Sequence, residues 1–203
     1  MTLKVPLIKQ ENPKNCAIAC VAMIMKYYQK GFNQNEFIKK LEVDKYGFSL
    51  LDIANFLIKQ GFKIEIGHFD QDLLCRSQFS KFPIKLKELE RYLSKTRIDK
   101  SLKPYLQEDI EFIKKHPKIL KIEPVTLQKL DHFLTKKIPV LIHVDVKSYF
   151  DKTDDSIHST LIIGKEKEQY IVLDPLLGKK ILPASQLLKA WRNGGGYYLV
   201  VLR

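Results

Sequence analysis

The sequence predicts an α+β fold with an N-terminal helical lobe and a C-terminal antiparallel β-sheet lobe. Apolar residues recur with helical spacing through most of the first 122 residues, and strand-like segments follow one another from residue 139 onward. A length of 203 residues, 45% of them hydrophobic and 29% charged, suits one globular domain that carries an insertion. Helices first and strands afterwards are typical of two lobes with a cleft between them.

Residues 1–69 form the predicted helical lobe. Asn15 is a suitable N-cap before the apolar run that begins at Cys16, and Ser49 with Asp52 three residues later gives another helix start. Gly61 is expected to end that helix. The expected elements are an extended segment at 5–8, helices at 16–30, 33–41 and 49–60, and a strand at 62–66.

Residues 70–122 are predicted to form a basic helical insertion. Lys and Arg outnumber Asp and Glu in this block, and Pro83, Pro104 and Pro117 interrupt it. No catalytic motif is visible there. Cys75 has no partner in the sequence, so we interpret it as structural.

Residues 123–203 form the predicted β-sheet lobe. A helix at 126–136 comes first, and a short helix at about 184–191 separates the last two strands. The strands are expected at 139–146, 158–164, 170–173, 179–182 and 197–202.

The formal net charge of +12 raises the question of an anionic partner. Basic residues are spread along the whole chain without a recognition signature, so we expect no specific nucleic acid but allow for an acidic peptide or partner. The longest apolar run, Ala17 to Met25, is too short to span a membrane. The first residues lack the features of a signal peptide, and a cytoplasmic location is therefore expected.

Cys16 is the first candidate for chemistry. A cysteine in the first turn of a helix meets unpaired N–H groups and the positive end of the helix dipole, and both favour the nucleophilic thiolate. The alternative is that Cys16 is a small core residue, which is our interpretation of Cys20 one turn later. Without further Cys or His nearby, the two make a poor metal site, so neither a metal nor an organic cofactor is expected.

Gln10 lies six residues before Cys16, across a turn. Its carboxamide could reach the same substrate oxygen as the backbone N–H of Cys16, and two fixed donors at one point form an oxyanion hole. The alternative is an ordinary surface glutamine.

His158 and Asp174 are the candidates for a base and its orienting group. His158 begins a strand directly after an acidic loop, and Asp174 ends the next strand sixteen residues later. If the two strands pair as a hairpin, Asp174 returns to His158 and can accept its imidazole N–H. A structural histidine and a turn-forming aspartate are the alternatives. Among the other histidines, we expect His143 in a strand and three solvated side chains, His68, His116 and His132.

The combination resembles the bacteriocin-processing cysteine peptidases of cysteine-peptidase family thirty-nine, which cut leader peptides after a double glycine. It rests on Gln-x5-Cys opening a helix, a glycine-led helix at 47–54 and His-x15-Asp-Pro on adjacent strands, and covers about residues 5–66 and 124–202. The resemblance implies a papain-like cysteine proteinase fold in a free-standing relative. It implies Gln10 as oxyanion donor, Cys16 as nucleophile, His158 as general base and acid, and Asp174 as orienting group.

Two features depart from the family pattern. Ala17 stands where the family usually has glycine, and residues 70–122 have no counterpart in the compact family domain. We expect hydrolysis of a peptide or protein substrate through a Cys thioester. The alternatives are a papain-like acyltransferase or amidase, and an inactive peptidase-like module that binds an acidic peptide or partner.

Overall fold

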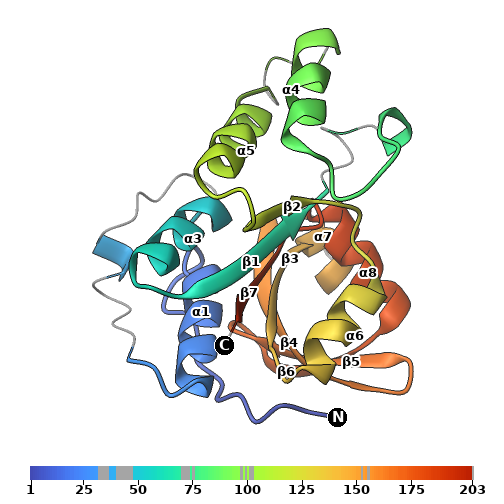
Figure 1. Ribbon diagram of the computed structural model, residues 1–203. Helices are drawn as coiled ribbons and strands as arrows, with labels where there is room; N and C mark the ends of the chain where they lie inside the picture. The colour runs from blue at the N-terminus through green and yellow to red at the C-terminus, as the bar shows by residue number, and fades with distance from the viewer. Residues whose placement is uncertain are drawn as a thin grey trace.

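A seven-stranded sheet in the order β2-β1-β7-β3-β4-β5-β6 forms the centre of the computed structural model (Figure 1). The structure describes residues 1–31, 37–39, 48–69, 74, 76–96, 98, 100, 103–151, 153–154 and 156–202. The strands are β1 (Lys63–His68), β2 (Leu120–Ile122), β3 (Val140–Asp145), β4 (Ile157–Glu166), β5 (Gln169–Asp174), β6 (Gly178–Pro183) and β7 (Tyr198–Leu202). Neighbouring strands are antiparallel except β1 and β2, which are parallel.

Helices lie on both sides of this sheet. In Figure 1, α1 and α3 lie on one side, and α6 and α8 lie on the other. The helices are α1 (Cys16–Tyr27), α3 (Leu50–Lys59), α4 (Leu86–Lys95), α5 (Lys103–Lys115), α6 (Leu127–Thr135), α7 (Val146–Phe150) and α8 (Ala184–Asn193), with a 3-10 turn η1 (Arg76–Gln78). The α+β class predicted from the sequence is confirmed.

Local capping chemistry explains where several helices begin. The Ser49 side chain accepts the N–H of Leu51 before α3, and Thr126 accepts the N–H of Lys129 before α6. Asn15 occupies the N-cap position of α1 but makes no capping side-chain bond. The left-handed Gly61 follows α3 as predicted. The helix predicted at 33–41 lies largely outside the described residues.

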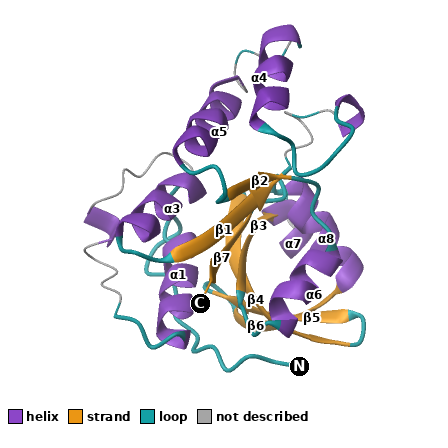
Figure 2. Cartoon of the chain, viewed as in Figure 1, coloured by secondary structure: helices purple, strands orange, loops and turns teal. Residues whose placement is uncertain are grey.

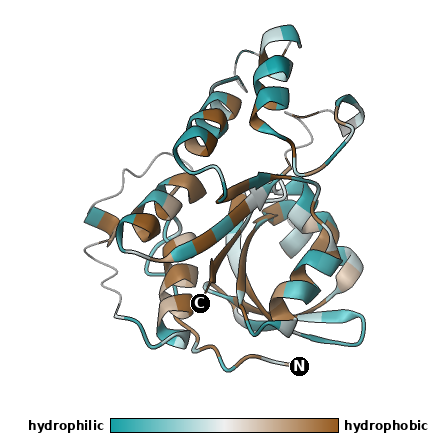
Figure 3. Ribbon diagram, in the orientation of Figure 1, coloured by the Kyte–Doolittle hydropathy of each residue, from teal (hydrophilic) through white to brown (hydrophobic). Residues whose placement is uncertain are grey.

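Helix α1 is the most deeply buried of the described helices. Every residue from Ala17 to Met25 is buried, and α1 packs against β3 and β4. In Figure 3, α1 and the strands are mostly hydrophobic, whereas α4 is mostly hydrophilic. Burial of Ala17 to Met25 fixes the first residue of the helix, Cys16, against the sheet.

Residues 70–122, the lysine-rich block, are joined to the sheet at their C-terminal end. Figure 2 shows α4 and α5 standing beyond the sheet, packed against each other. The block then returns as β2, a strand that was not predicted, and the Ile84 N–H donates to the Ile122 carbonyl at 2.8 Å. The sheet therefore includes β1 and β2, which precede the predicted β-sheet lobe.

Gly67 marks a close approach within the sheet. A Cβ at this position would overlap the ring of Tyr198, its partner across β1 and β7, whose hydroxyl donates to Glu65 at 2.8 Å. We expect Gly67→Ala to lower the free energy of unfolding by about 2 kcal/mol, because the ring must leave its packed position. Gly31→Ala is the control, since nothing lies within 4 Å of its Cβ position. Chemical denaturation of both variants measures the effect, and equal stabilities would contradict it.

Candidate active site

Cys16 lies at the first position of α1, half-buried against the start of β4. His158 and Ser159, at the start of β4, lie close enough to Cys16 to lower the pKa of its thiol. The thiol therefore meets the end of a helix dipole and a histidine at one point.

His158 and Asp174 come together as the hairpin hypothesis requires. Strands β4 and β5 pair antiparallel with Leu161 opposite Leu173. This register brings His158 Nε2 to 3.1 Å from Asp174 Oδ2. The two side chains are 7% and 0% exposed, so water has little access to their hydrogen bond. The predicted juxtaposition is confirmed.

The carboxylate of Asp174 is held from both sides. Its other oxygen, Oδ1, accepts the backbone N–H groups of Leu176 at 2.8 Å and Leu177 at 2.9 Å. Burial alone raises the pKa of this carboxyl. The His158 hydrogen bond and charge and these two N–H donors outweigh burial and leave the pKa below its ordinary value. Asp174 is therefore a charged, fixed acceptor for the imidazole.

The imidazole and the thiol favour each other's charged forms. Burial lowers the pKa of His158, but hydrogen bonds and charge interactions with Asp174 and Cys16 raise it overall to about 9. Burial raises the pKa of Cys16, whereas His158 and Ser159 lower it by more, so that it falls below its ordinary value. Since Nε2 is held by Asp174, Nδ1 is the ring nitrogen left to face the thiol.

Gln10 lies beside the turn that follows Asp174. Its backbone N–H donates to the Pro175 carbonyl at 3.0 Å, and the Lys9 ammonium donates to the Leu176 carbonyl at 2.8 Å. The Gln10 carboxamide donates one hydrogen to the Asn12 carbonyl at 3.0 Å, while its oxygen is buried without a hydrogen-bond partner. A carboxamide carries two hydrogens, so the Asn12 bond uses half of its donor capacity.

Three neighbours of the candidate site were not identified from the sequence. Ser159 is 2% exposed and lies beside Cys16, and Tyr149 and Phe150 in α7 pack next to His158. His143 lies opposite Ser159, and burial together with the His158 charge lowers its pKa to about 4. The sequence pattern gave little indication of Tyr149 and Phe150, because the helix that carries them, α7, is only five residues long.

The expectation that His68 is solvated is wrong. His68 is fully buried, with Nε2 2.9 Å from Asp109 Oδ2 on α5, and its ring stacks on Tyr197 at 4.3 Å. The reason is that α5 covers this part of β1, an interaction between residues 41 positions apart. His132 is exposed, as predicted, and His116 is half-buried.

Cys20 does not extend the site. Cys20 is fully buried, and burial, the Cys16 charge and the Asp174 charge raise the pKa of its thiol well above the ordinary value. This confirms its structural interpretation. Cys75 lies outside the described residues. Within the described ranges, no group of three or more His, Cys, Asp or Glu side chains could hold a metal ion.

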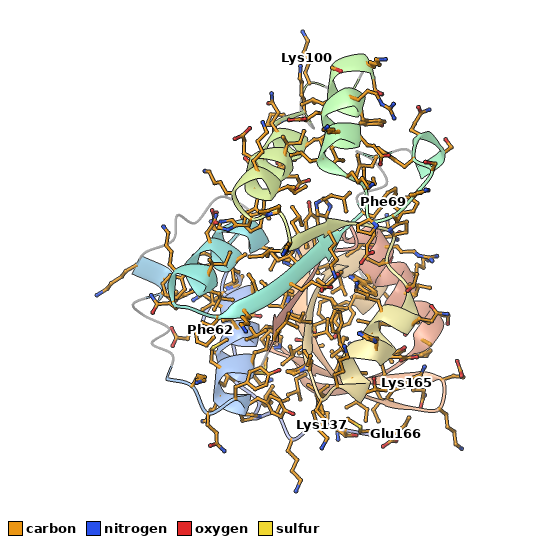
Figure 4. All side chains as sticks on the ribbon, viewed as in Figure 1. Phe62, Phe69, Lys100, Lys137, Lys165 and Glu166 are labelled. Atoms are coloured by element: carbon orange, nitrogen blue, oxygen red, sulfur yellow. The ribbon has the colours of Figure 1, made fainter. Side chains whose placement is uncertain are left out.

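Basic side chains are distributed over opposite ends of the molecule. In Figure 4, Lys100 projects from the end beyond α4 and α5, while Lys137 projects from the far end. Several other lysines are paired, including Lys121 with Glu65 and Lys129 with Glu123. Among the described helices, none has both the length and the apolar character needed to span a membrane.

Comparison with known families identifies a peptidase pattern in the N-terminal part. Residues 4–92 match the model described as the Peptidase C39 family. The match continues past residue 66, into the lysine-rich block. No curated protein matches the chain.

Comparison with solved structures identifies the fold. A C39-like peptidase from Bacillus anthracis aligns with a TM-score of 0.57 at 12% identity, over 98% of this chain and 95% of the other. A double glycine motif protease from an AMS/PCAT transporter, crystallised with a leader peptide, aligns with a TM-score of 0.54 at 14% identity. This alignment covers 100% of this chain and 94% of the protease. The peptidase domain of Streptococcus ComA, a bi-functional ABC transporter, aligns with a TM-score of 0.54 at 14% identity. This alignment covers 98% of this chain and 99% of that domain. The predicted resemblance and the papain-like fold are confirmed.

Proposed function

We propose that this chain, which matches the Peptidase C39 family over residues 4–92 and has the fold of C39 peptidase domains, is an active cysteine peptidase. The observation that carries the proposal is the contact of Cys16, at the start of a buried helix, with an imidazole that Asp174 fixes at 3.1 Å. A lowered thiol pKa beside a raised imidazole pKa favours the thiolate–imidazolium pair.

The proposed reaction is acyl transfer through a thioester. The Cys16 thiolate attacks the carbonyl carbon of a peptide bond, and its oxygen becomes an oxyanion bound by the Gln10 carboxamide and the Cys16 backbone N–H. As the C–N bond breaks, His158 gives its proton to the departing amine. His158 then takes a proton from water, which attacks the thioester and releases the acid and the free thiol.

The proposed substrate is a peptide or protein segment that binds over Cys16. A protease with the same fold was crystallised with a leader peptide, which supports a peptide ligand for this chain. We propose that residues 70–122 border or extend the surface that binds this segment. The net charge of +12 favours an acidic segment in the substrate.

The pH dependence of iodoacetamide labelling at Cys16 tests the proposal. An ordinary thiol has a pKa of about 8.5. In the wild type, labelling should be rapid well below this pH, because His158 lowers the pKa of Cys16. Labelling should persist above pH 9, because His158 then loses its proton while Cys16 stays ionised. In His158→Ala the lowering contacts are lost and burial remains, so labelling should move to higher pH.

Cys20 serves as the internal reference, because its buried thiol should not react with iodoacetamide anywhere in this pH range while the protein is folded. Mass spectrometry of the labelled peptides separates the two cysteines. If Cys16 reacts only near its ordinary pKa, with or without His158, the thiolate–imidazolium pair is not formed. A peptidase-like module that binds peptides without cleaving them then becomes the better explanation.

A further inference from the structure

Three neighbouring strands place a row of side chains beside Cys16. Ser159 on β4, which lies near the Cys16 thiol, is paired with His143 on β3. The His143 backbone N–H donates in turn to the carbonyl of Tyr197, directly before β7, at 3.1 Å. Side chains of directly paired residues lie on the same face of a sheet, and the rings of His143 and Tyr197 are 5.6 Å apart. The row therefore begins at the candidate nucleophile and leads away from it across β4, β3 and β7.

The far end of this row is fixed in place. The Tyr197 ring stacks on the fully buried His68 ring at 4.3 Å, and Asp109 of α5 lies 2.9 Å from His68. The Tyr197 carbonyl accepts two N–H groups, one from the Trp191 indole at 2.9 Å and one from the His143 backbone. Two hydrogen bonds to its backbone and a buried ring against its face hold Tyr197 in one position. Tyr197 therefore forms a fixed wall next to the His143 imidazole.

The His143 imidazole is available to a ligand. Its neighbours in β3, Ile142 and Val144, are fully buried, whereas His143 is only half-buried. Within the part of the chain that the structure describes, no group forms a hydrogen bond with the His143 ring nitrogens. Burial and the His158 charge lower the pKa of His143 to about 4, so the ring is uncharged at neutral pH. An uncharged imidazole offers one N–H donor and one acceptor nitrogen.

The face on which His143 lies indicates which side of the cleaved bond it meets. Consecutive residues of a strand point to opposite faces of the sheet, so His158 and Ser159 project to opposite faces of β4. His143 shares the face of Ser159, its partner across the two strands. In the proposed reaction, His158 gives its proton to the departing amine. The amine side of the peptide therefore lies on the His158 face, and the acyl side lies on the face of His143.

We propose that His143 is a substrate-binding residue that hydrogen-bonds the backbone of the acyl part of the peptide, the segment on the N-terminal side of the cleaved bond, beside the wall formed by Tyr197. An extended peptide presents N–H and C=O groups in alternation, which matches a ring with one donor and one acceptor. This role rests on the proposed function, because it requires a peptide over Cys16. The recognition surface then extends from the nucleophile toward α5 of the lysine-rich block.

Alkylation of Cys16 by acetyl-Ala-Ala-Gly chloromethyl ketone tests this role. The Cys16 sulfur bonds to the methylene carbon and chloride leaves, so the reagent carries the acyl part of a substrate without a leaving amine. His143→Phe keeps a ring but removes both ring nitrogens. We expect the dissociation constant of the reagent, KI, to rise about three- to tenfold, as for the loss of one hydrogen bond between uncharged groups. Iodoacetamide, which carries no peptide, should label both proteins equally fast, because His143 is uncharged at neutral pH.

His132→Phe is the matched control, because it makes the same exchange at an exposed histidine of α6, on the other side of the sheet from α1 (Figure 1). It should keep the wild-type KI. His143→Gln again supplies a donor and an acceptor, so it should recover most of the affinity. An unchanged KI in folded His143→Phe would overturn the role of His143. A parallel fall in the iodoacetamide rate would also overturn it, since His143 would then support the thiolate and not the peptide.

NMR of the His143 ring nitrogens tests the same contact without a variant. Alkylation of the wild type by the peptidyl ketone should shift these resonances, whereas alkylation by iodoacetamide should shift them much less. Equal shifts with the two reagents would overturn the role of His143. If Cys16 reacts with neither reagent at neutral pH, the proposed function fails and His143 has no substrate to bind. If both reagents react and KI does not depend on His143, the proposed function stands and only the role of His143 fails.

Discussion

Replacing Cys16 with alanine is expected to abolish peptide cleavage while leaving the fold intact. The thiolate is the atom that forms the proposed thioester, and no neighbouring group can replace it, because Cys20 is buried with a raised thiol pKa. Cys16 is half-buried at the N-terminal end of α1, so the packing of the core should tolerate the loss of its sulfur. Cleavage is measured by mass spectrometry of peptide products, and folding by circular dichroism.

Cys20→Ala is the matched control for this experiment. It removes a thiol one helical turn away and leaves a cavity in the core, so the protein should lose stability but keep its cleavage activity. Cleavage by Cys16→Ala at the wild-type rate would exclude Cys16 as the nucleophile. Loss of activity in both variants would indicate damage to α1 and not loss of the nucleophile.

The parts of the candidate site that sequence could predict depend on short-range structure. Cys16 follows a capping residue at the start of an apolar run, and the approach of Asp174 to His158 requires only that two consecutive strands form a hairpin. Such pairing is set by neighbouring elements and by alternation along the strands. The geometry could therefore be expected before the fold was known.

The parts that could not be predicted depend on contacts between distant segments. His68 is buried because Asp109 approaches it from α5, and β2 joins β1 in a parallel pair across a long connection. A sequence window around His68 contains neither partner. Helix α7 was not predicted for another reason: five residues give too few turns for an apolar period to be recognised. Tyr149 and Phe150 therefore fell in the connection between the strands predicted at 139–146 and 158–164.

Gln10 is expected to contribute the second largest effect, through the oxyanion. Gln10→Ala should lower kcat by about 100- to 1,000-fold with little change in KM, the typical cost of removing one oxyanion donor. The structure supports this because the bond to Asn12 uses one carboxamide hydrogen, and the backbone bond to Pro175 holds Gln10 beside the turn after Asp174. Gln10→Glu should be at least as impaired, since it replaces the donor with a charged acceptor.

Two measurements separate this role from a structural one. Iodoacetamide labelling of Cys16 in Gln10→Ala should keep the wild-type pH dependence, because an oxyanion donor acts on the transition state and not on the free thiolate. Lys9→Ala removes the neighbouring tie to the Leu176 carbonyl at 2.8 Å, and its kcat should stay within about threefold of the wild type. A shifted labelling profile in Gln10→Ala would mean that Gln10 supports the position of Cys16. If kcat of Gln10→Ala stays within tenfold of the wild type, Gln10 is not the oxyanion donor. A different group would then act together with the backbone N–H of Cys16.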